Sequence, residues 1–168
     1  MLIAYALPEL QSSVPYLQAT ACWAYGQFFN LEFADTYHLN QIIEGLYHSL
    51  FSQNLPVRYS AAIALTQLLR NKAVEPIVKP VLNQVLEKFL QITAEMDSEK
   101  LISSLEEIMS VYREDIVPFA NQICSQLVEQ FMKQIANNED PDAFCAAIGT
   151  ISALRKVLES SQKQPLVL

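Results

Sequence analysis

The chain has 168 residues, of which 51% are hydrophobic and 17% charged, with a formal net charge of −7. This length suits one ordinary domain or a few stacked units, and the apolar content is ample for a core. Its three glycines are too few for hairpin turns or phosphate-binding loops, so an all-helical fold is expected. The acidic balance argues against nucleic-acid binding by phosphate neutralisation.

The two ends of the sequence indicate a piece of a longer protein. Met1–Leu7 is apolar and is expected to be the tail of a helix, which Pro8 interrupts before a loop running to Val14. This segment lacks basic residues and is too short to cross a bilayer, so neither a signal peptide nor membrane insertion is predicted. Gln164–Leu168 also ends abruptly. We therefore expect a fragment of a longer chain.

Two helices are predicted next, over residues 15–30 and 36–52. Pro15 opens the first helix, at a position where a proline loses no useful hydrogen bond. Trp23 lies beside its apolar face and is interpreted as a structural residue, a core anchor between repeats. The expected inner residues of the two helices are Leu17, Ala21, Ala24 and Phe28, then Leu39, Ile42, Ile43, Leu46 and Leu50.

The segment Leu55–Leu69 is predicted to form a short helix with Pro56 in its first turn. Arg58 is interpreted as a structural residue that reaches carbonyls or acids of a neighbouring repeat. Ala61 and Ala64 are small enough to let a second helix approach closely. The expected inner face is Val57, Ala61, Ala64, Leu65 and Leu68. A helix this short is marginal alone in water, so it is expected to be one layer of a stack.

Four further helices are predicted in the rest of the chain. Residues 76–95 carry apolar pairs every four positions, with a kink or a late helix start expected at Pro80. Asp97 is expected to cap the next helix, which is followed by helices over 115–137 and 141–159. The expected inner residues are Leu101, Leu105, Ile108, Tyr112, Ile116, Ala120, Ile123, Leu127, Phe131, Phe144, Ile148, Ile151 and Leu154.

The helix starts recur along the chain, with spacings of 41 to 43 residues between Pro15, Pro56, Asp97 and Asp140. A period of about 40–47 residues with two helices per unit is typical of HEAT-repeat solenoids. A four-helix bundle, the competing fold, has fewer helices of more equal length. The predicted fold is therefore all-α, an α–α superhelix of about three and a half helical pairs. It consists of a stub at 1–7 and repeats at approximately 15–52, 56–95, 97–137 and 140–160.

The sequence offers little for catalysis, and no enzyme, metal site or cofactor site is predicted. His38 and His48 lie on one helix without cysteines nearby, which does not match a metal-binding spacing. The acidic pairs Glu106–Glu107 and Glu114–Asp115 are interpreted as solvated charges rather than catalytic carboxylates. The cysteines are expected to be buried thiols in a reducing compartment: Cys22, Cys124 and Cys145.

Several pieces of the sequence resemble a known family. Pro56-Val57-Arg58, followed by Ala61-Ala62 and Ala64-Leu65, is similar to the first helix of a HEAT repeat. Pieces that resemble nuclear transport receptors occur in order along the chain: Pro8-Glu9-Leu10, Tyr16-Leu17, Ala19, Ala21-Cys22-Trp23, Leu55-Pro56-Val57, Ile77, Pro80-Val81, Tyr112, Glu114, Ile116 and Pro118. This series is similar to the middle of importin-beta (karyopherin-beta) superfamily members, most of all the importin seven and eight branch. The resemblance covers about residues 7–160.

The resemblance implies a superhelical receptor that carries cargo through the nuclear pore and releases it on binding Ran-GTP. Such a receptor shuttles between cytoplasm and nucleus and also binds nucleoporins. Recognition of Ran is expected mainly nearer the N-terminus of these receptors. In this family, pockets for phenylalanine–glycine nucleoporin segments form between neighbouring first helices, so a pocket at Trp23 is the alternative to a core anchor.

Four acidic residues are candidate cargo contacts on the same implication. In HEAT solenoids the second helix of each pair lines the concave face, which would place Glu44, Glu87, Glu95 and Glu129 toward a cargo groove. Such a surface attracts basic cargo, for example ribosomal proteins or histones. Ordinary solvent-facing charges are the alternative interpretation of these residues. The alternative function is a generic HEAT-repeat scaffold or adaptor for the assembly of protein complexes.

Overall fold

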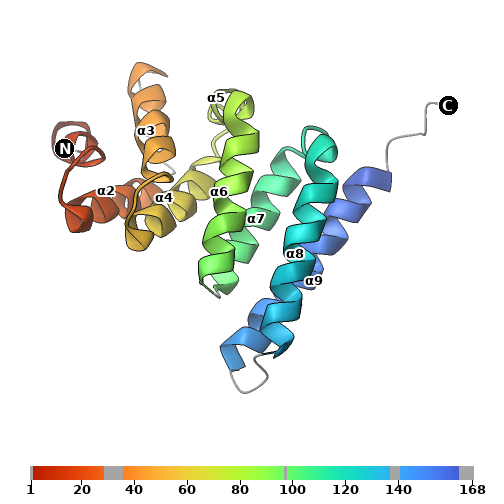
Figure 1. Ribbon diagram of the computed structural model, residues 1–168. Coiled ribbons are helices and arrows are strands. Elements are labelled where there is room, and N and C mark those ends of the chain that lie inside the picture. The colour runs from red at the N-terminus through yellow and green to blue at the C-terminus, as the bar shows by residue number, and fades with distance from the viewer. Residues whose placement is uncertain (1, 29–35, 97, 137–140, 163–168) are drawn as a thin grey trace. The chain divides into compact units, whose positions relative to one another are not determined.

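The computed structural model describes residues 2–28, 36–96, 98–136 and 141–162, and every regular element within these ranges is helical (Figure 1). Four helices begin at Pro15, Leu55, Glu99 and Pro141, each within two residues of a predicted helix start. The predicted all-α, HEAT-like solenoid is therefore confirmed. The chain divides into two compact units, Met1–Lys88 and Phe89–Leu168. The boundary between the two units lies within one helix, α6 (Leu82–Glu95).

Unit 1 is built from short helical segments followed by three longer helices. In it, α2 packs mainly against α4, α3 also packs against α4, and α1 contacts both α2 and α3. Its elements are η1 (Leu2–Ala6), α1 (Leu7–Glu9), α2 (Pro15–Gln27), α3 (Thr36–Ser49), α4 (Leu55–Leu68), α5 (Glu75–Val78), η2 (Lys79–Val81) and the start of α6.

Two prolines in unit 1 were expected to interrupt helices, and only one of them does. Pro8 was expected to interrupt the first helix, but it lies in the first turn of α1, and the chain stays helical through Glu9. That prediction is wrong because a proline in the first helical turn lacks only an N–H that would be unpaired anyway. Pro80 lies in the 3₁₀ turn η2 between α5 and α6, which confirms the predicted late helix start.

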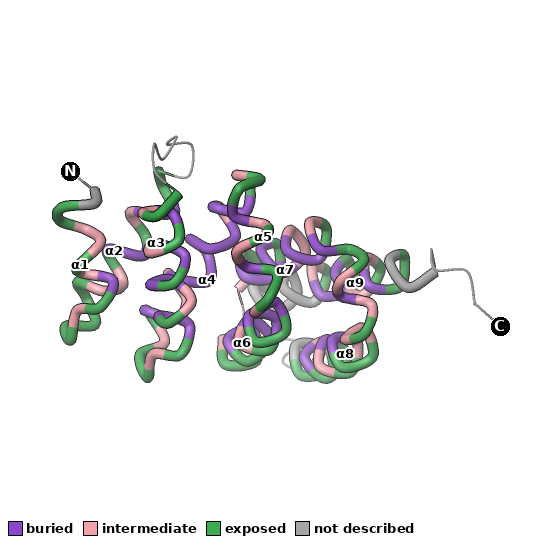
Figure 2. The backbone as a smooth tube through the Cα atoms, turned by 90° about the horizontal axis from the view of Figure 1, so that it is seen from above, coloured by how far each residue is buried: buried purple, intermediate pink, exposed green. Residues whose placement is uncertain are grey.

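The core of unit 1 centres on α4, which is buried on nearly all sides (Figure 2). The predicted inner faces of α3 and α4 are confirmed, since all of their residues are buried. The predicted face of α2 is only partly right, because Ala21 is buried but Leu17 is 41% and Phe28 47% exposed. The residues that α2 does bury are Ala21, Cys22, Tyr25 and Gly26.

The contact between α2 and α4 is set by small residues. A Cβ atom added at Gly26 would lie only 3.1 Å from the Cα atom of Ala64 and would also meet Oε1 of Gln67. Ala64 therefore lets another helix approach closely, as predicted, and that helix is α2. This close approach explains why α2 turns Gly26 and its neighbours inward instead of its larger side chains.

Unit 2 begins with the C-terminal part of α6. In it, both α7 and α8 pack against α9. Its other elements are α7 (Glu99–Val111), η3 (Val117–Phe119), α8 (Ala120–Ala136) and α9 (Pro141–Gln162). Ser98, with extended backbone, occupies the N-cap position of α7 and makes no side-chain capping bond. The predicted cap at Asp97 is therefore wrong in position, and Asp97 itself lies outside the described residues.

The faces of the unit 2 helices match the predictions unevenly. Leu101, Leu105, Ile108 and Tyr112 are buried, as are Ile116, Ile123 and Leu127. The predicted face of α9 is wrong, because Ile148 is 54% and Ile151 51% exposed. Phe144, also predicted on that face, lies outside the residues with described side chains. The residues that α9 buries instead are Thr150, Ala153 and Val157.

Candidate protein-interaction surfaces

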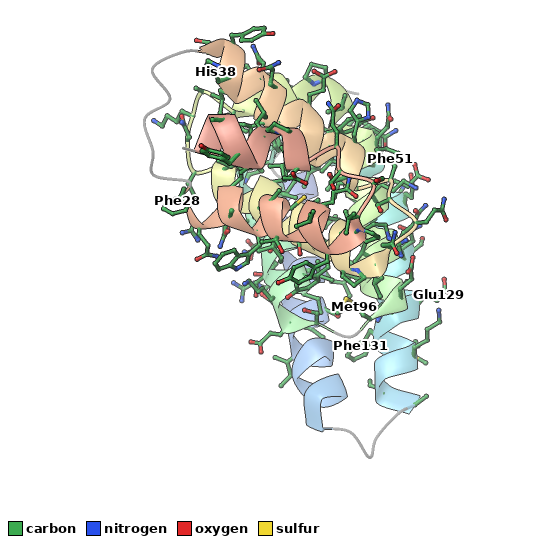
Figure 3. The ribbon with its side chains drawn as sticks, turned by 90° about the vertical axis from the view of Figure 1, so that its left-hand side faces the viewer. Phe28, His38, Phe51, Met96, Glu129 and Phe131 are labelled. Carbon is green, nitrogen blue, oxygen red and sulfur yellow. The ribbon has the colours of Figure 1, made fainter. Side chains whose placement is uncertain are left out.

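The four candidate cargo-facing glutamates are all exposed, Glu44 and Glu87 in unit 1 and Glu95 and Glu129 in unit 2. Oε1 of Glu44 lies 3.8 Å from Nε2 of His48, and Oε1 of Glu129 lies 3.5 Å from Nζ of Lys133. Figure 3 labels Glu129. Both pairs are largely exposed and one helical turn apart, so they add little to stability. The carboxylates are accessible to a partner, and their alignment along one cargo groove stays a prediction.

The negative charge is concentrated in one unit. Residues 1–88 contain six acidic and five basic side chains, whereas residues 89–168 contain twelve acidic and six basic ones. Unit 2 therefore carries a formal charge of −6 out of the total of −7. Such an excess raises the local concentration of basic partners and speeds their association.

The exposed face of α2 carries aromatic side chains. Trp23 is 57% exposed, so the prediction that it anchors the core is wrong. Tyr16, seven residues earlier on the same helical face, is 76% exposed. These two rings are accessible to a partner. A nucleoporin pocket at Trp23 stays a prediction.

A second aromatic cluster joins α3 to the start of α6. The ring centroids of Tyr47 and Phe51 are 5.2 Å apart in an edge-to-face arrangement, and Nζ of Lys88 lies 4.9 Å from the centroid of the Phe51 ring. The hydroxyl of Tyr47 donates to Oε1 of Gln84. The spacing of Tyr47 and Phe51, one helical turn, was the only sequence signal of this cluster. Its internal contacts indicate a structural role.

Arg58 fixes the turn before α4. Its Nη1 donates to the backbone carbonyls of Ser52 and Gln53, at 3.1 and 3.3 Å. Pro56 lies in the first turn of α4 and is exposed. These two hydrogen bonds hold the turn that follows α3.

A polar cluster that the sequence did not reveal lies inside unit 1. Nε2 of Gln18 donates to the carbonyl of Leu10 at 2.9 Å and to Oγ of Ser49 at 3.3 Å. Burial raises the pKa of the Cys22 thiol to about 11, and this effect outweighs the hydrogen bond with Ser49, which lowers the pKa. Burial likewise raises the pKa of Cys124. Neither thiol is an activated nucleophile, because such cysteines need a lowered pKa.

The paired carboxylates of α7 are not both solvated as predicted. Glu106 accepts a hydrogen bond from Nζ of Lys156 on α9 at 2.9 Å, and the Glu106 side chain is only 17% exposed. This ion pair joins two helices of unit 2.

Among the described residues no group of three His, Cys, Asp or Glu side chains is placed to hold a metal ion. No helix within the same ranges is both long and apolar enough to span a membrane.

A pocket of about 140 Å³ opens between the C-terminal part of α6 and the middle of α8, entirely within unit 2. Leu90, Ala94 and Leu127 provide apolar walls, and Gln126 and Glu129 are among the polar residues of the lining. Oε1 of Gln126 is buried and has no hydrogen-bond partner. Glu129 is the one candidate glutamate that lines this pocket.

Comparison with known proteins reveals relatives along nearly the whole chain. A probable importin-7 homolog of Dictyostelium discoideum is 31% identical over 144 residues, which cover 85% of this chain and 13% of the relative. An importin beta-like SAD2 homolog of Arabidopsis thaliana is 30% identical, covering 98% of this chain and 16% of the relative. Importin-8 of Danio rerio is 29% identical, with coverage of 94% and 16%.

No family model and no solved structure matches the chain. The chain spans 13 to 18% of the length of the curated relatives that it matches. The three relatives described above are named as importins or as importin-like, and the described residues form the succession of helices that the resemblance implied. The chain therefore belongs to the importin-beta (karyopherin-beta) superfamily and is similar to a segment of importin-7, importin-8 and SAD2 homologs.

Proposed function

We propose that the chain is a segment of a nuclear import receptor that binds cargo proteins and carries them through the nuclear pore under Ran-GTP control. The observation that carries this proposal is the similarity to importins over 85 to 98% of the chain. Ran, nucleoporins and cargo are the partners proposed for the whole receptor, which would shuttle between cytoplasm and nucleus. Its role is binding rather than catalysis.

The acidic surface supports basic proteins as cargo. Glu44, Glu87, Glu95 and Glu129 are accessible, and unit 2 has twice as many acidic as basic side chains. Ribosomal proteins and histones have the complementary charge. Attraction of this kind accelerates association and weakens as salt rises.

The transport function is tested with the full-length receptor that contains this segment. The receptor is immobilised, loaded with cytosolic partners, and treated with Ran bound to a non-hydrolysable GTP analogue or to GDP. Ran-GTP is expected to bind the receptor and release the cargo, whereas Ran-GDP is not. If Ran-GTP neither binds nor displaces any partner, the generic HEAT-repeat scaffold becomes the better account.

The cargo surface has its own test. Replacing Glu44, Glu87, Glu95 and Glu129 together by glutamine is expected to weaken binding of a core histone at least tenfold. The control replaces Glu75, Glu99, Glu114 and Glu159 by glutamine, so the net charge changes by the same amount in both variants. Equal weakening by both sets would show that only net charge matters, and the proposed cargo contacts would be wrong.

A further inference from the structure

We infer that the pocket between α6 and α8, here called the Gln126 pocket, binds an arginine side chain of a partner protein. Its defining residues are Leu90, Ala94, Gln126, Leu127, Glu129 and Lys133. This inference deepens the proposed function, because it assigns one contact to the basic cargo proposed above. It is argued only from residues of unit 2.

The size and walls of the pocket suit a single long side chain. A cavity of roughly 150 Å³ holds one benzene molecule, so the observed volume of about 140 Å³ admits one side chain and no folded element. Leu90 and Leu127 are buried apolar residues at its wall. An aliphatic stem can lie along such a wall while its polar end reaches the rim.

The polar end of the occupant must be a hydrogen-bond donor. Oε1 of Gln126 is buried without a hydrogen-bond partner, and an unsatisfied buried acceptor is costly. Gln126 lines the pocket, and the terminal amide torsion of glutamine is broad, so its amide can turn toward an occupant. A donor placed there would satisfy the oxygen, whereas an apolar occupant such as phenylalanine would leave it unsatisfied.

The rim adds a negative charge that selects a cation. Glu129 lies at the pocket, and its pairing with Lys133 at 3.5 Å involves side chains that are 70% and 61% exposed. An exposed pair of this kind is weak, so an incoming guanidinium can replace Lys133 as the partner of Glu129. The surrounding unit has a formal charge of −6, which favours a basic segment over an acidic one.

Arginine fits these groups better than lysine does. A guanidinium has five N–H donors in one plane, so it can contact the Glu129 carboxylate and the Gln126 oxygen together. It is also less strongly hydrated than an ammonium group and is the usual choice for partly buried contacts. A lysine would offer a single strongly hydrated charge on the same kind of stem.

The test measures peptide binding to the 168-residue chain by fluorescence anisotropy. The probes are labelled glycine–serine peptides that carry three arginines, three lysines or three phenylalanines. The arginine peptide is expected to bind most tightly. Gln126→Leu is expected to weaken it about tenfold, the loss of one hydrogen bond to a charged group. Gln122→Leu, at an exposed position of α8, is the matched control and is expected to stay within twofold of wild type.

A second variant and a stability measurement separate binding from folding. Glu129→Gln is expected to weaken the arginine peptide about fivefold, while Glu99→Gln, another exposed glutamate of unit 2, is its control. The melting temperature of Gln126→Leu is expected to stay unchanged or rise, because the variant removes an unsatisfied acceptor. A structural role alone would leave the Kd of the peptide unchanged.

The outcomes show whether the Gln126 pocket binds arginine, and they do so independently of the proposed transport function. Equal binding of the arginine peptide to wild type, Gln126→Leu and Glu129→Gln would overturn the pocket, as would tighter binding of the phenylalanine peptide or no arginine binding at all. None of these results involves Ran, so the proposed transport function would still rest on its own experiment. Loss of binding in both variants, with both controls intact, would establish the pocket even if Ran-GTP released nothing.

Discussion

The two units contain similar helices but hold them together in different ways. In unit 1, α2 and α4 approach so closely that Gly26 has no room for a side chain. In unit 2, the corresponding contact of α7 with α9 involves the side chain of Ile102 opposite Gly149 and an ion pair between Glu106 and Lys156. Unit 1 is nearly neutral, whereas unit 2 carries most of the negative charge.

This difference in packing predicts that the two units respond to different kinds of substitution. Backbones held in contact by small residues tolerate little change of volume, since close-packed interiors yield only by shifting whole helices. Helices joined through longer side chains can adjust, and their charges stay near the surface. Unit 1 is therefore expected to respond most to steric changes, and unit 2 to changes of charge.

The largest effect is expected for Gly26→Leu. The new side chain would meet the backbone of Ala64, and the resulting overpacking is expected to lower the free energy of unfolding by about 3 kcal/mol. Gln27→Leu, its exposed neighbour on α2, is the control and is expected to change stability by less than about 0.5 kcal/mol. Urea unfolding of both variants measures the difference. Equal midpoints would show that α2 and α4 do not meet at Gly26.

The cysteines of the two units are expected to differ in reactivity. In a Cys145→Ser background at pH 8, Cys22 should react with a maleimide about 100-fold more slowly in the folded chain than in urea. The reason is that burial raises its pKa from 9.0 to about 11, which lowers the reactive thiolate fraction. Cys124, which is half-buried, is expected to react first. Rapid labelling of Cys22 in the folded chain would contradict the α2–α3 contact that covers it.

The same pKa shift has a consequence for stability. The folded state favours the protonated Cys22 thiol. The contribution of this thiol to the free energy of unfolding is therefore fully present below about pH 9. It is lost as the pH rises from 9 toward 11, because the unfolded chain ionises first. Cys22→Ala is expected to abolish this part of the alkaline instability, measured as the urea midpoint against pH.

The sequence predicted those faces where apolar and polar residues alternate clearly, as on α3 and α7. It failed on α2 and α9, where apolar side chains occur all around the helix and the small residues decide which side lies inward. Trp23 shows the difficulty: its size suggested the core, but Gly26 and Ala64 admit the closer approach on another face. The Gln126 pocket could not be predicted, because its walls come from two helices and its unsatisfied oxygen depends on side-chain geometry.

An intermediate effect is expected for Lys156→Met in unit 2. The variant leaves the carboxylate of Glu106 without its ion-pair partner, at a site where that side chain is only 17% exposed. The expected loss is about 1 kcal/mol, less than for a fully buried pair because Lys156 is partly solvated. Arg155→Met, which breaks the exposed pair with Glu159, is the control and is expected to cost less than about 0.5 kcal/mol. A double-mutant cycle with Glu106→Gln measures the coupling energy between the two side chains. A coupling energy of zero would show that the ion pair does not stabilise unit 2.

The smallest effects are expected for glycine-to-alanine variants, whose change in stability should have opposite signs in the two units. Alanine at Gly149 would bring a Cβ within 3.2 Å of Cγ2 of Ile102, a side-chain atom that can move by a few tenths of an ångström. Alanine also gains up to about 1 kcal/mol over glycine inside a helix, so Gly149→Ala is expected to stabilise the chain slightly. Gly26→Ala brings the same gain but meets the Cα atom of Ala64 at 3.1 Å, which cannot move without its helix, so it is expected to destabilise. If both variants shift the thermal midpoint in the same direction, backbone contact and side-chain contact are not what distinguishes the two units.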